Sequence, residues 1–291
     1  MFWQDIRNVI SQSFNKRGLS LIKEKLHSLM FNSIKLSLKE AEDEQIQIGE
    51  SKMGGVPDLP AEVSWPMWRG IPLAFICQIN LNEFRPFDEE KLLPSEGMLY
   101  FFYEANEQPW GFDPLDKGST RVIYYSGDTS ALFRVTLPDN LPAESRFGAC
   151  KISFIREVTM PSWESQYIER LGLTKKELDI YSDYQIKVQE EVEEVRINRL
   201  LGHSDNIQGD MQLECQLVTN GLYCGDETGY NDERRKVLET NAVNWRLLLQ
   251  IDSNEEIGMY WGDLGRIYFW IREDDLKKKN FDNVWTILQC G

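Results

Sequence analysis

The chain has 291 residues, of which 42% are hydrophobic and 12% aromatic. This composition excludes an intrinsically disordered chain, because it supplies enough apolar surface for a sizeable core. The formal net charge of −15 would repel the phosphates of nucleic acid and the anionic surface of a membrane, so we expect neither as a partner. A length prior of roughly 100–200 residues per domain favours two lobes or one large unit.

An N-terminal helical section is predicted over residues 1–50. Hydrophobic residues recur in it mainly at intervals of three and four, which is the periodicity of an amphipathic helix. We expect one or two helices whose apolar face packs against the body of the protein, although such a face could equally receive a partner. The pattern is carried by Ile6, Val9, Ile10, Phe14, Leu19, Leu21, Ile22, Leu26, Leu29 and Met30.

A first β-rich lobe is predicted over residues 51–160. It opens with a Gly- and Pro-rich loop at 54–60, and Trp65 and Trp68 follow in a loop bounded by proline. The run 73–81 is nearly all apolar and too short for a typical helix, which favours a strand buried on both faces. Further strands rich in β-branched or aromatic residues are predicted at 97–103, 121–125, 132–137 and 152–155.

A helical connection is predicted over residues 161–202, before a second lobe at 203–291. Within the connection, Thr174 and Glu177 have the spacing of a capping box at a helix N-terminus. Residues 211–217 alternate between apolar and polar positions, which predicts a strand with one buried face.

Two pairs of segments indicate that one structural unit occurs twice. The segment 75–80 is echoed by 247–252, and 97–102 is echoed by 265–270. Such self-similarity is the sequence signature of a repeated unit. The predicted fold class is therefore α+β, with mostly antiparallel β-sheets from an internally duplicated unit and with added N-terminal and central helices.

The cysteines and the N-terminus indicate the cellular compartment. The five cysteines are scattered through apolar contexts, so we interpret them as reduced, buried thiols. The nearest pair, Cys215 and Cys224, is too widely spaced for a typical zinc site, and we expect no metal and no cofactor. The N-terminus lacks the pattern of a secretory signal, and no apolar run approaches about 18 residues, so we expect a cytoplasmic protein.

Several short motifs follow one another in a specific order and spacing. They are Lys52-Met53-Gly54-Gly55-x-Pro57, Leu59-Pro60, Trp65-Pro66, Gln78-Ile79-Asn80, Gly97-x-Leu99-Tyr100-Phe101-Phe102, Leu201-Gly202-His203, Gln250-Ile251-Asp252, Trp261-Gly262-Asp263-Leu264-Gly265, Asp275-Leu276 and Phe281-Asp282-Asn283-Val284. Together they resemble the YwqG-like family of bacterial proteins from about residue 51 to the C-terminus. The resemblance implies an α+β fold with internal duplication, and it carries over no activity and no catalytic residues. The association of some relatives with toxin and immunity gene neighbourhoods hints at protein binding.

Gln78 and Gln250 occupy matching positions inside apolar strands. A buried amide without partners would cost about 1–3 kcal/mol, so both side chains must be hydrogen-bonded. In one interpretation each amide caps the backbone of a loop. In the other, the two amides line a ligand cleft as a pseudo-symmetric pair.

His203, Asp205, Asp210 and Asp263 form the best available acid, base or ligand cluster. Histidine titrates near neutrality, and carboxylates could orient it or hold a cation. The alternatives are ordinary: His203 lies where a helix is predicted to end, and Asp263 has the setting of a turn residue.

Four tryptophans are the remaining candidates for binding. Trp65, Trp68, Trp110 and Trp261 could supply stacking surfaces for a sugar, a base or a prolyl residue, but aromatic residues are also the main filler of protein cores. No phosphate-binding loop, nucleophile elbow or metalloprotease motif is present in the sequence.

Two functions are therefore predicted, and the sequence leans towards the first. One is a non-catalytic interaction protein, which could be immunity-like, whose acidic surface binds a protein partner with a basic surface. The other is an enzyme or small-molecule binder that uses a cleft between the two repeats, with a pocket near Gln78, His203, Gln250 and Asp263. The oligomeric state is open.

Overall fold

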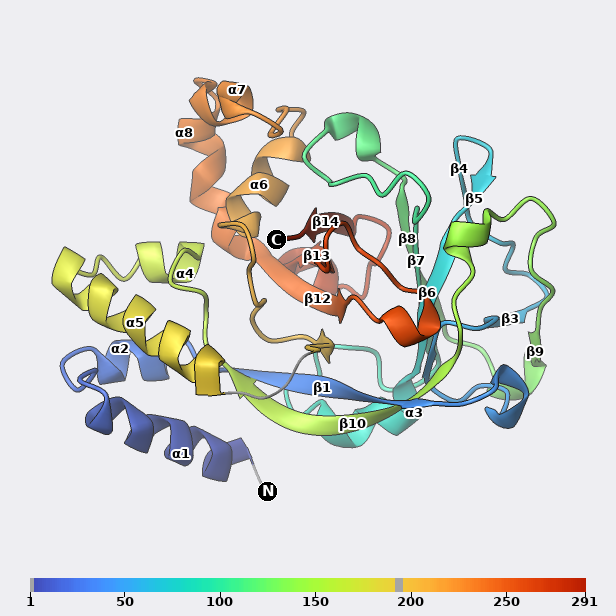
Figure 1. Ribbon diagram of the computed structural model, residues 1–291, viewed down its shortest axis with the longest axis horizontal. Helices are drawn as coiled ribbons and strands as arrows, with labels where there is room; N and C mark the ends of the chain where they lie inside the picture. The colour runs from blue at the N-terminus through green and yellow to red at the C-terminus, as the bar shows by residue number, and fades with distance from the viewer. Residues whose placement is uncertain (1–2, 192–195) are drawn as a thin grey trace.

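One antiparallel sheet of ten strands dominates the computed structural model, which describes residues 3–191 and 196–291 (Figure 1). Its strands lie in the order β14-β13-β12-β11-β1-β10-β2-β6-β7-β8, and two further pairs, β3-β9 and β4-β5, form small separate sheets. Because helices pack around this sheet, the fold class is α+β with antiparallel sheets, and this part of the prediction is confirmed.

The strands differ greatly in length, and β1 and β10 are the longest described. Their bounds are β1 Phe31–Glu40, β2 Lys52–Met53, β3 Asp58–Pro60, β4 Met67–Trp68, β5 Ile71–Pro72, β6 Ala74–Asn80, β7 Met98–Tyr103, β8 Thr120–Tyr125, β9 Leu132–Arg134, β10 Cys150–Thr159, β11 Arg199–Leu200, β12 Trp245–Asp252, β13 Arg266–Arg272 and β14 Trp285–Gln289.

The helices gather in two groups. Figure 1 shows α1, α2, α4 and α5 together at one end of the β1–β10 pair, and α6 to α8 beside β12 to β14. None of the helices in the described part combines the length and the apolar character that a membrane crossing needs. The bounds are α1 Trp3–Lys16, α2 Lys23–His27, α3 Leu81–Phe84, α4 Gln166–Glu169, α5 Lys175–Glu191, α6 Met211–Val218, α7 Glu227–Asn231, α8 Arg235–Leu238 and α9 Glu273–Lys277.

The central pair, β1 and β10, joins two similar sets of strands. We call β2, β6, β7 and β8 the first half, and β11, β12, β13 and β14 the second half. Strand β1 precedes the first half in the chain but pairs with β11 of the second half. Strand β10 precedes the second half but pairs with β2 of the first half. Because β1 and β10 also pair with each other, they join the two halves at the centre of the sheet.

The sheet curves so strongly that its two outer strands approach each other. Arg121 of β8 lies 3.4 Å from the carboxylate of Asp282, which precedes β14. The rings of Tyr124 and Phe281 lie 6.1 Å apart on the same side. The interior between the halves is filled with hydrophobic side chains, and Phe101 of β7 meets Phe269 of β13 edge-on at 5.3 Å. The space between the halves is therefore a core.

The two halves share detailed irregularities. Strand pair β6–β7 has a register shift between Phe75 and Cys77, and β12–β13 has one between Leu247 and Leu249. Each shift ends one residue before a buried glutamine, Gln78 in β6 and Gln250 in β12.

Two sequence predictions are wrong at the level of local structure. Residues 31–40, predicted within a helical section, form β1, because backbone partners are available on both sides of this segment. Residues 211–217, predicted as a strand, form α6, whose N-cap Asp210 accepts hydrogen bonds from two backbone N–H groups of the first turn. Two of the three polar positions of this segment are the buried amides Gln212 and Gln216, so the alternation did not mark a solvent-facing side. Residues 192–195 of the predicted helical connection lie outside the described residues.

The central position of β1 can be tested by a pair of substitutions. Leu36→Ala removes a side chain that is 2% exposed, and we expect it to lower the free energy of unfolding by about 2–5 kcal/mol. Lys39→Ala, at an exposed position of the same strand, is the control and should change it by less than about 0.5 kcal/mol. Urea denaturation measures both. If the two substitutions lowered the free energy of unfolding equally, the central, buried position of β1 in the sheet would be contradicted.

Candidate functional site

Gln78 holds the loop that enters the first half. Its side-chain oxygen accepts a hydrogen bond from the backbone N–H of Asp58 at 2.8 Å. Its amide nitrogen donates to the carbonyl of Glu50 and to the carboxylate of Asp58, both at 2.8 Å. Tyr100 of β7 completes the group, because its hydroxyl donates to the Asp58 carbonyl at 2.6 Å. All these contacts tie the 50–58 loop to the sheet.

Gln250 makes the same set of contacts in the second half. Its oxygen accepts from the backbone N–H of Asp205 at 3.0 Å, and its nitrogen donates to the Ile197 carbonyl at 2.9 Å and the Asp205 carboxylate at 3.1 Å. The hydroxyl of Tyr268 in β13 donates to the Asp205 carbonyl at 2.7 Å. We call these two groups the glutamine locks.

A cation lies beside the aspartate of each lock. Arg199 pairs with the Asp205 carboxylate at 2.7 Å. Lys52 pairs with Asp43 at 2.8 Å and lies 3.9 Å from Asp58. Burial lowers the pKa of Lys52, an effect that the hydrogen bond to Asp43 partly opposes. These buried charges compensate each other, which makes them structural partners of the loops.

The glutamine locks match the loop-capping interpretation of Gln78 and Gln250. Sequence analysis did not find their partners Asp58, Tyr100 and Tyr268. A signal was nevertheless present, because each lock contains a cation followed at the same interval by the aspartate, Lys52 before Asp58 and Arg199 before Asp205.

His203 is buried beside the second lock and is neutral. Its Nε2 lies 2.8 Å from the Leu29 carbonyl, so this nitrogen carries the proton and donates. The ring stacks on Phe31 at 4.1 Å and meets Tyr167 edge-on at 5.2 Å. Burial lowers the pKa of His203 to about 3, and the hydrogen bond to Leu29 opposes this only in part. A general base needs a pKa nearer to neutrality, so this environment does not suit acid–base work.

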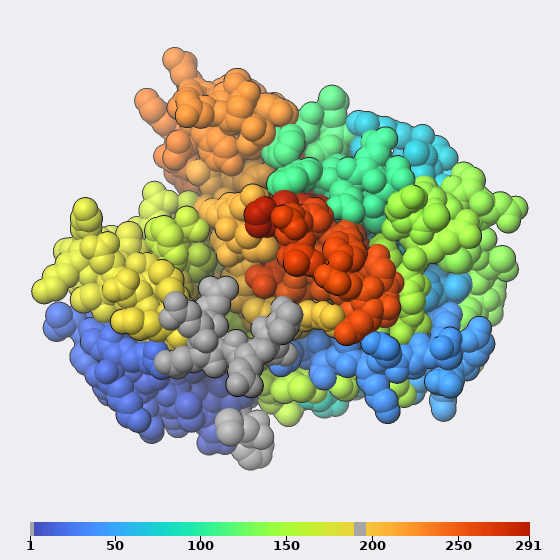
Figure 2. All heavy atoms as spheres, viewed as in Figure 1, coloured from blue at the N-terminus to red at the C-terminus, as the bar shows by residue number. Residues whose placement is uncertain are grey.

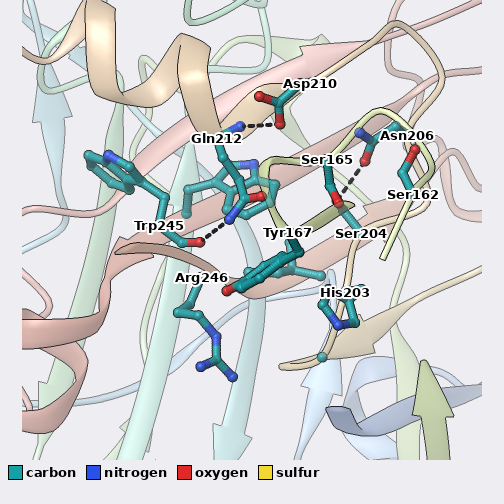
Figure 3. Close-up of a pocket in the computed structure, with 13 residues that line it drawn as sticks. Ser162, Ser165, Tyr167, His203, Ser204, Asn206, Asp210, Gln212, Trp245 and Arg246 are labelled. Carbon is teal, nitrogen blue, oxygen red and sulfur yellow. Dashed lines mark hydrogen bonds between the residues drawn. The ribbon is translucent and has the colours of Figure 1, made fainter. Parts of the chain in front are cut away.

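A small cavity adjoins His203, between α4, α6 and β12 (Figure 3). The centre of a water molecule can move in only about 10 Å³ of it, which leaves no room for an organic substrate. Asp210 lies on its wall, and burial raises the pKa of this carboxyl to about 6, while hydrogen bonds from Gln212 and Leu213 lower it. Burial also raises the pKa of Glu214, in the first turn of α6, to about 8.

The indole nitrogens of two candidate tryptophans donate to the backbone, that of Trp65 to Leu73 at 2.9 Å and that of Trp68 to Lys117 at 3.1 Å. Trp261 is fully buried in the interior against Tyr103 and Phe147. Asp263 is exposed in the turn that follows.

The structure brings some of the predicted residues together and separates others. Asp205 and Gln250 bond to each other, and His203 lies two residues before Asp205 in the chain. Gln78 lies in the other half of the sheet, and Asp263 lies on the surface. The described part of the protein therefore does not bring Gln78, His203, Gln250 and Asp263 together around one point. Among the described residues, no group of three His, Cys, Asp or Glu side chains is placed to hold a metal ion. All five cysteines are buried and free.

Comparison with known families was informative for most of the chain. A family described as "Domain of unknown function (DUF1963)" matches residues 51–290. The chain belongs to the DUF1963 family. The matched region contains Gln78, Gln250 and all their lock partners except Glu50, whereas α1, α2 and β1 precede it. A comparison with curated proteins found no match.

Replacing a lock glutamine tests its structural role. Gln250→Leu leaves the Asp205 N–H and the Ile197 carbonyl without their partner, so we expect the free energy of unfolding to fall by roughly 2–4 kcal/mol. Gln78→Leu should lower the free energy of unfolding by a similar amount. Gln208→Leu, at an exposed position in the same loop region, is the matched control and should stay within about 0.5 kcal/mol. Chemical denaturation that found all three variants as stable as the parent would refute the locks.

The buried His203 predicts a pH dependence of stability. Its pKa is lower in the folded protein, about 3, than the ordinary value of 6.5, so the unfolded chain binds the extra proton first as pH falls. The stability contribution is full above pH 6.5 and is lost progressively down to about pH 3, at up to about 1.4 kcal/mol per pH unit. His203→Gln should flatten this acid-side loss, as measured by thermal or urea unfolding at several pH values. Parallel stability curves for the two proteins would contradict a neutral buried histidine.

Proposed function

We propose that this protein is a non-catalytic binding module that recognises a protein partner with a basic surface. Two observations support an external rather than an internal site. The polar residues that could have lined a cleft between the halves are engaged in the glutamine locks. The space between the halves is a packed hydrophobic core, in which Phe101 contacts Phe269.

The proposed binding surface contains three aromatic side chains from separate parts of the chain. Trp110, Tyr223 and Tyr260 are 37%, 40% and 44% exposed. Phe112 connects the first two, because its ring lies 6.4 Å from that of Trp110 and 5.6 Å from that of Tyr223. Gln108 connects the third, because its side chain bonds the Tyr260 carbonyl at 2.8 Å and the Gly262 N–H at 2.9 Å. We call Trp110, Tyr223 and Tyr260 the aromatic surface.

The segments that carry the aromatic surface lie on one face of the molecule. Figure 2 shows the loop 104–118 in green between the orange segment that contains α7 and α8 and the red segment near the C-terminus. The loop is fixed in place, because the Trp110 carbonyl accepts from Leu288 N–H at 3.0 Å and the Phe112 carbonyl accepts from Cys224 N–H at 2.8 Å. Rigid aromatic side chains are the commonest energetic centres of protein interfaces.

Acidic residues lie next to the aromatic surface in the chain, and they determine the kind of partner. None of them forms an ion pair within 4.0 Å in the described part of the protein, so their charge is available to a partner. With a chain charge of −15, a basic surface would be attracted at long range and would be bound more weakly at high salt. These residues are Glu107, Asp226, Glu227, Glu255 and Asp263, and all are exposed.

The proposal includes three finer points. An immunity-like role is one form of this function, in which the basic partner would be a toxin. The motifs quoted above support a YwqG-like assignment and a bacterial origin. The five free, buried cysteines support a cytoplasmic location, because reducing compartments keep thiols from pairing.

Enzymatic activity has one observation in its favour and one against it. Asp210 and Glu214 have raised pKa values, about 6 and about 8, which is a feature of many catalytic acids. Burial is the first cause of both shifts, however, and the adjoining cavity has only about 10 Å³ for the centre of a water molecule. The binding module is therefore the function that the geometry supports best.

The test compares three proteins in affinity capture from the organism that encodes the chain, with quantitative mass spectrometry. The wild type is compared with Trp110→Ala/Tyr223→Ala/Tyr260→Ala. We expect a basic protein to be captured by the wild type, and purified partner to bind the triple variant at least about tenfold more weakly, since interface centres contribute over 1.4 kcal/mol. Binding should weaken as salt is raised.

The control is Met67→Ala/Phe133→Ala/Trp163→Ala, which removes similarly exposed apolar side chains elsewhere on the molecule. It should bind like the wild type. A partner that binds the aromatic-surface variant with unchanged affinity, or binding that is indifferent to salt, would count against the proposal.

A further inference from the structure

Three of the residues that line the cavity beside His203 each carry a buried polar atom that has no hydrogen-bond partner in the described part of the protein. These atoms are Ser165 Oγ, Gln212 Oε1 and Trp270 Nε1. Their side chains are 7%, 2% and 4% exposed, and all three residues line the same cavity. Buried polar groups in folded proteins are nearly always paired, so three unpaired atoms around one cavity indicate a missing common partner.

The three atoms come from three separate segments of the chain. Ser165 precedes α4, Gln212 is in the first turn of α6, and Trp270 is in β13. The amide nitrogen of Gln212 already donates to the Trp245 carbonyl at 2.8 Å, which leaves its oxygen free to accept. The Trp270 indole can only donate, whereas the Ser165 hydroxyl can do either. A partner must therefore both accept and donate hydrogen bonds.

The size of the cavity selects the partner. An ordered water needs about 10–15 Å³ for its centre and two to four polar neighbours. The cavity offers about 10 Å³, so one water fits and a larger ligand does not. We propose that this cavity is a built site for one ordered water molecule, which accepts from Trp270, donates to Gln212 and bonds Ser165. The water links α4, α6 and β13.

In the first half, an indole ring makes the hydrogen bond that corresponds to the one from Gln212. Leu73 and Trp245 each lie five residues before a lock glutamine. The carbonyl of Leu73 accepts from Trp65 Nε1 at 2.9 Å, as the carbonyl of Trp245 accepts from Gln212 Nε2 at 2.8 Å. The Trp65 ring also packs edge-on against Phe102 at 5.6 Å. An amide is much smaller than an indole, so a cavity remains beside Gln212 (Figure 3).

Nuclear Overhauser spectroscopy with water detects such a molecule in solution. We expect a cross-peak between water and the Trp270 indole N–H, with the sign of a long-lived contact. Trp261 supplies an internal control, because its indole nitrogen is also buried and unpaired but lies among hydrophobic rings. Its N–H should give no such cross-peak. Trp270→Phe and Trp261→Phe assign the two indole signals.

Two variants make the result specific. Ser165→Ala removes one partner and should weaken the Trp270 cross-peak, and Gln212→Leu removes the acceptor and should abolish it. Retention of the other amide resonances shows that each variant is folded. If Gln212→Leu does not fold, the Trp270 cross-peak of Ser165→Ala is sufficient to test the proposal. The proposal is overturned if Trp270 gives no water cross-peak, if Trp261 gives an equal one, or if the peak is unchanged in a folded variant. It is independent of the proposed binding function.

Discussion

The pairing of β1 with β10 is the constraint on which the rest of the structure depends. Phe31–Glu40 and Cys150–Thr159 form an antiparallel ladder along their whole length, and β1 then pairs with β11 of the second half while β10 pairs with β2 of the first half. The halves cannot separate without breaking this ladder. For the same reason, the space between them closes as a core, and recognition is left to the outer surface.

The glutamine locks show how the same local problem is solved twice. In each half, a loop crosses the sheet and leaves backbone groups that no strand satisfies. Gln78 and Gln250 satisfy these groups, and a tyrosine of the next strand fixes the same aspartate. We propose that the halves are copies of one unit, supported by these matched contacts and by the matched register shifts. Their outer layers differ, since short strands cover the first half and α6 to α8 the second.

Sequence predicted the parts of the fold in which local pattern and tertiary setting agree. The apolar runs became β6 and β12, and the predicted capping box is confirmed, because the Thr174 N–H and hydroxyl both donate to Glu177 at 2.8 Å. Prediction from sequence failed where tertiary contacts determine the secondary structure. The strand alternation at Ile34 and Leu36 was overlooked, because the preceding residues have helical periodicity. Residues 211–217 were predicted as a strand, but α6 buries Gln212 and Gln216 nearly as fully as its buried apolar residues. The cavity was unpredictable, because Ser165, Gln212 and Trp270 meet only in the folded chain.

Native-state hydrogen exchange tests most directly whether the ladder makes the molecule one cooperative unit. The account predicts that the amides of β1, β10, β6 and β12 exchange only through global unfolding, with one common free energy of opening. If the strands of the second half opened at a distinctly lower free energy than those of the first, while β1 and β10 exchanged early, the central role of the ladder would be contradicted.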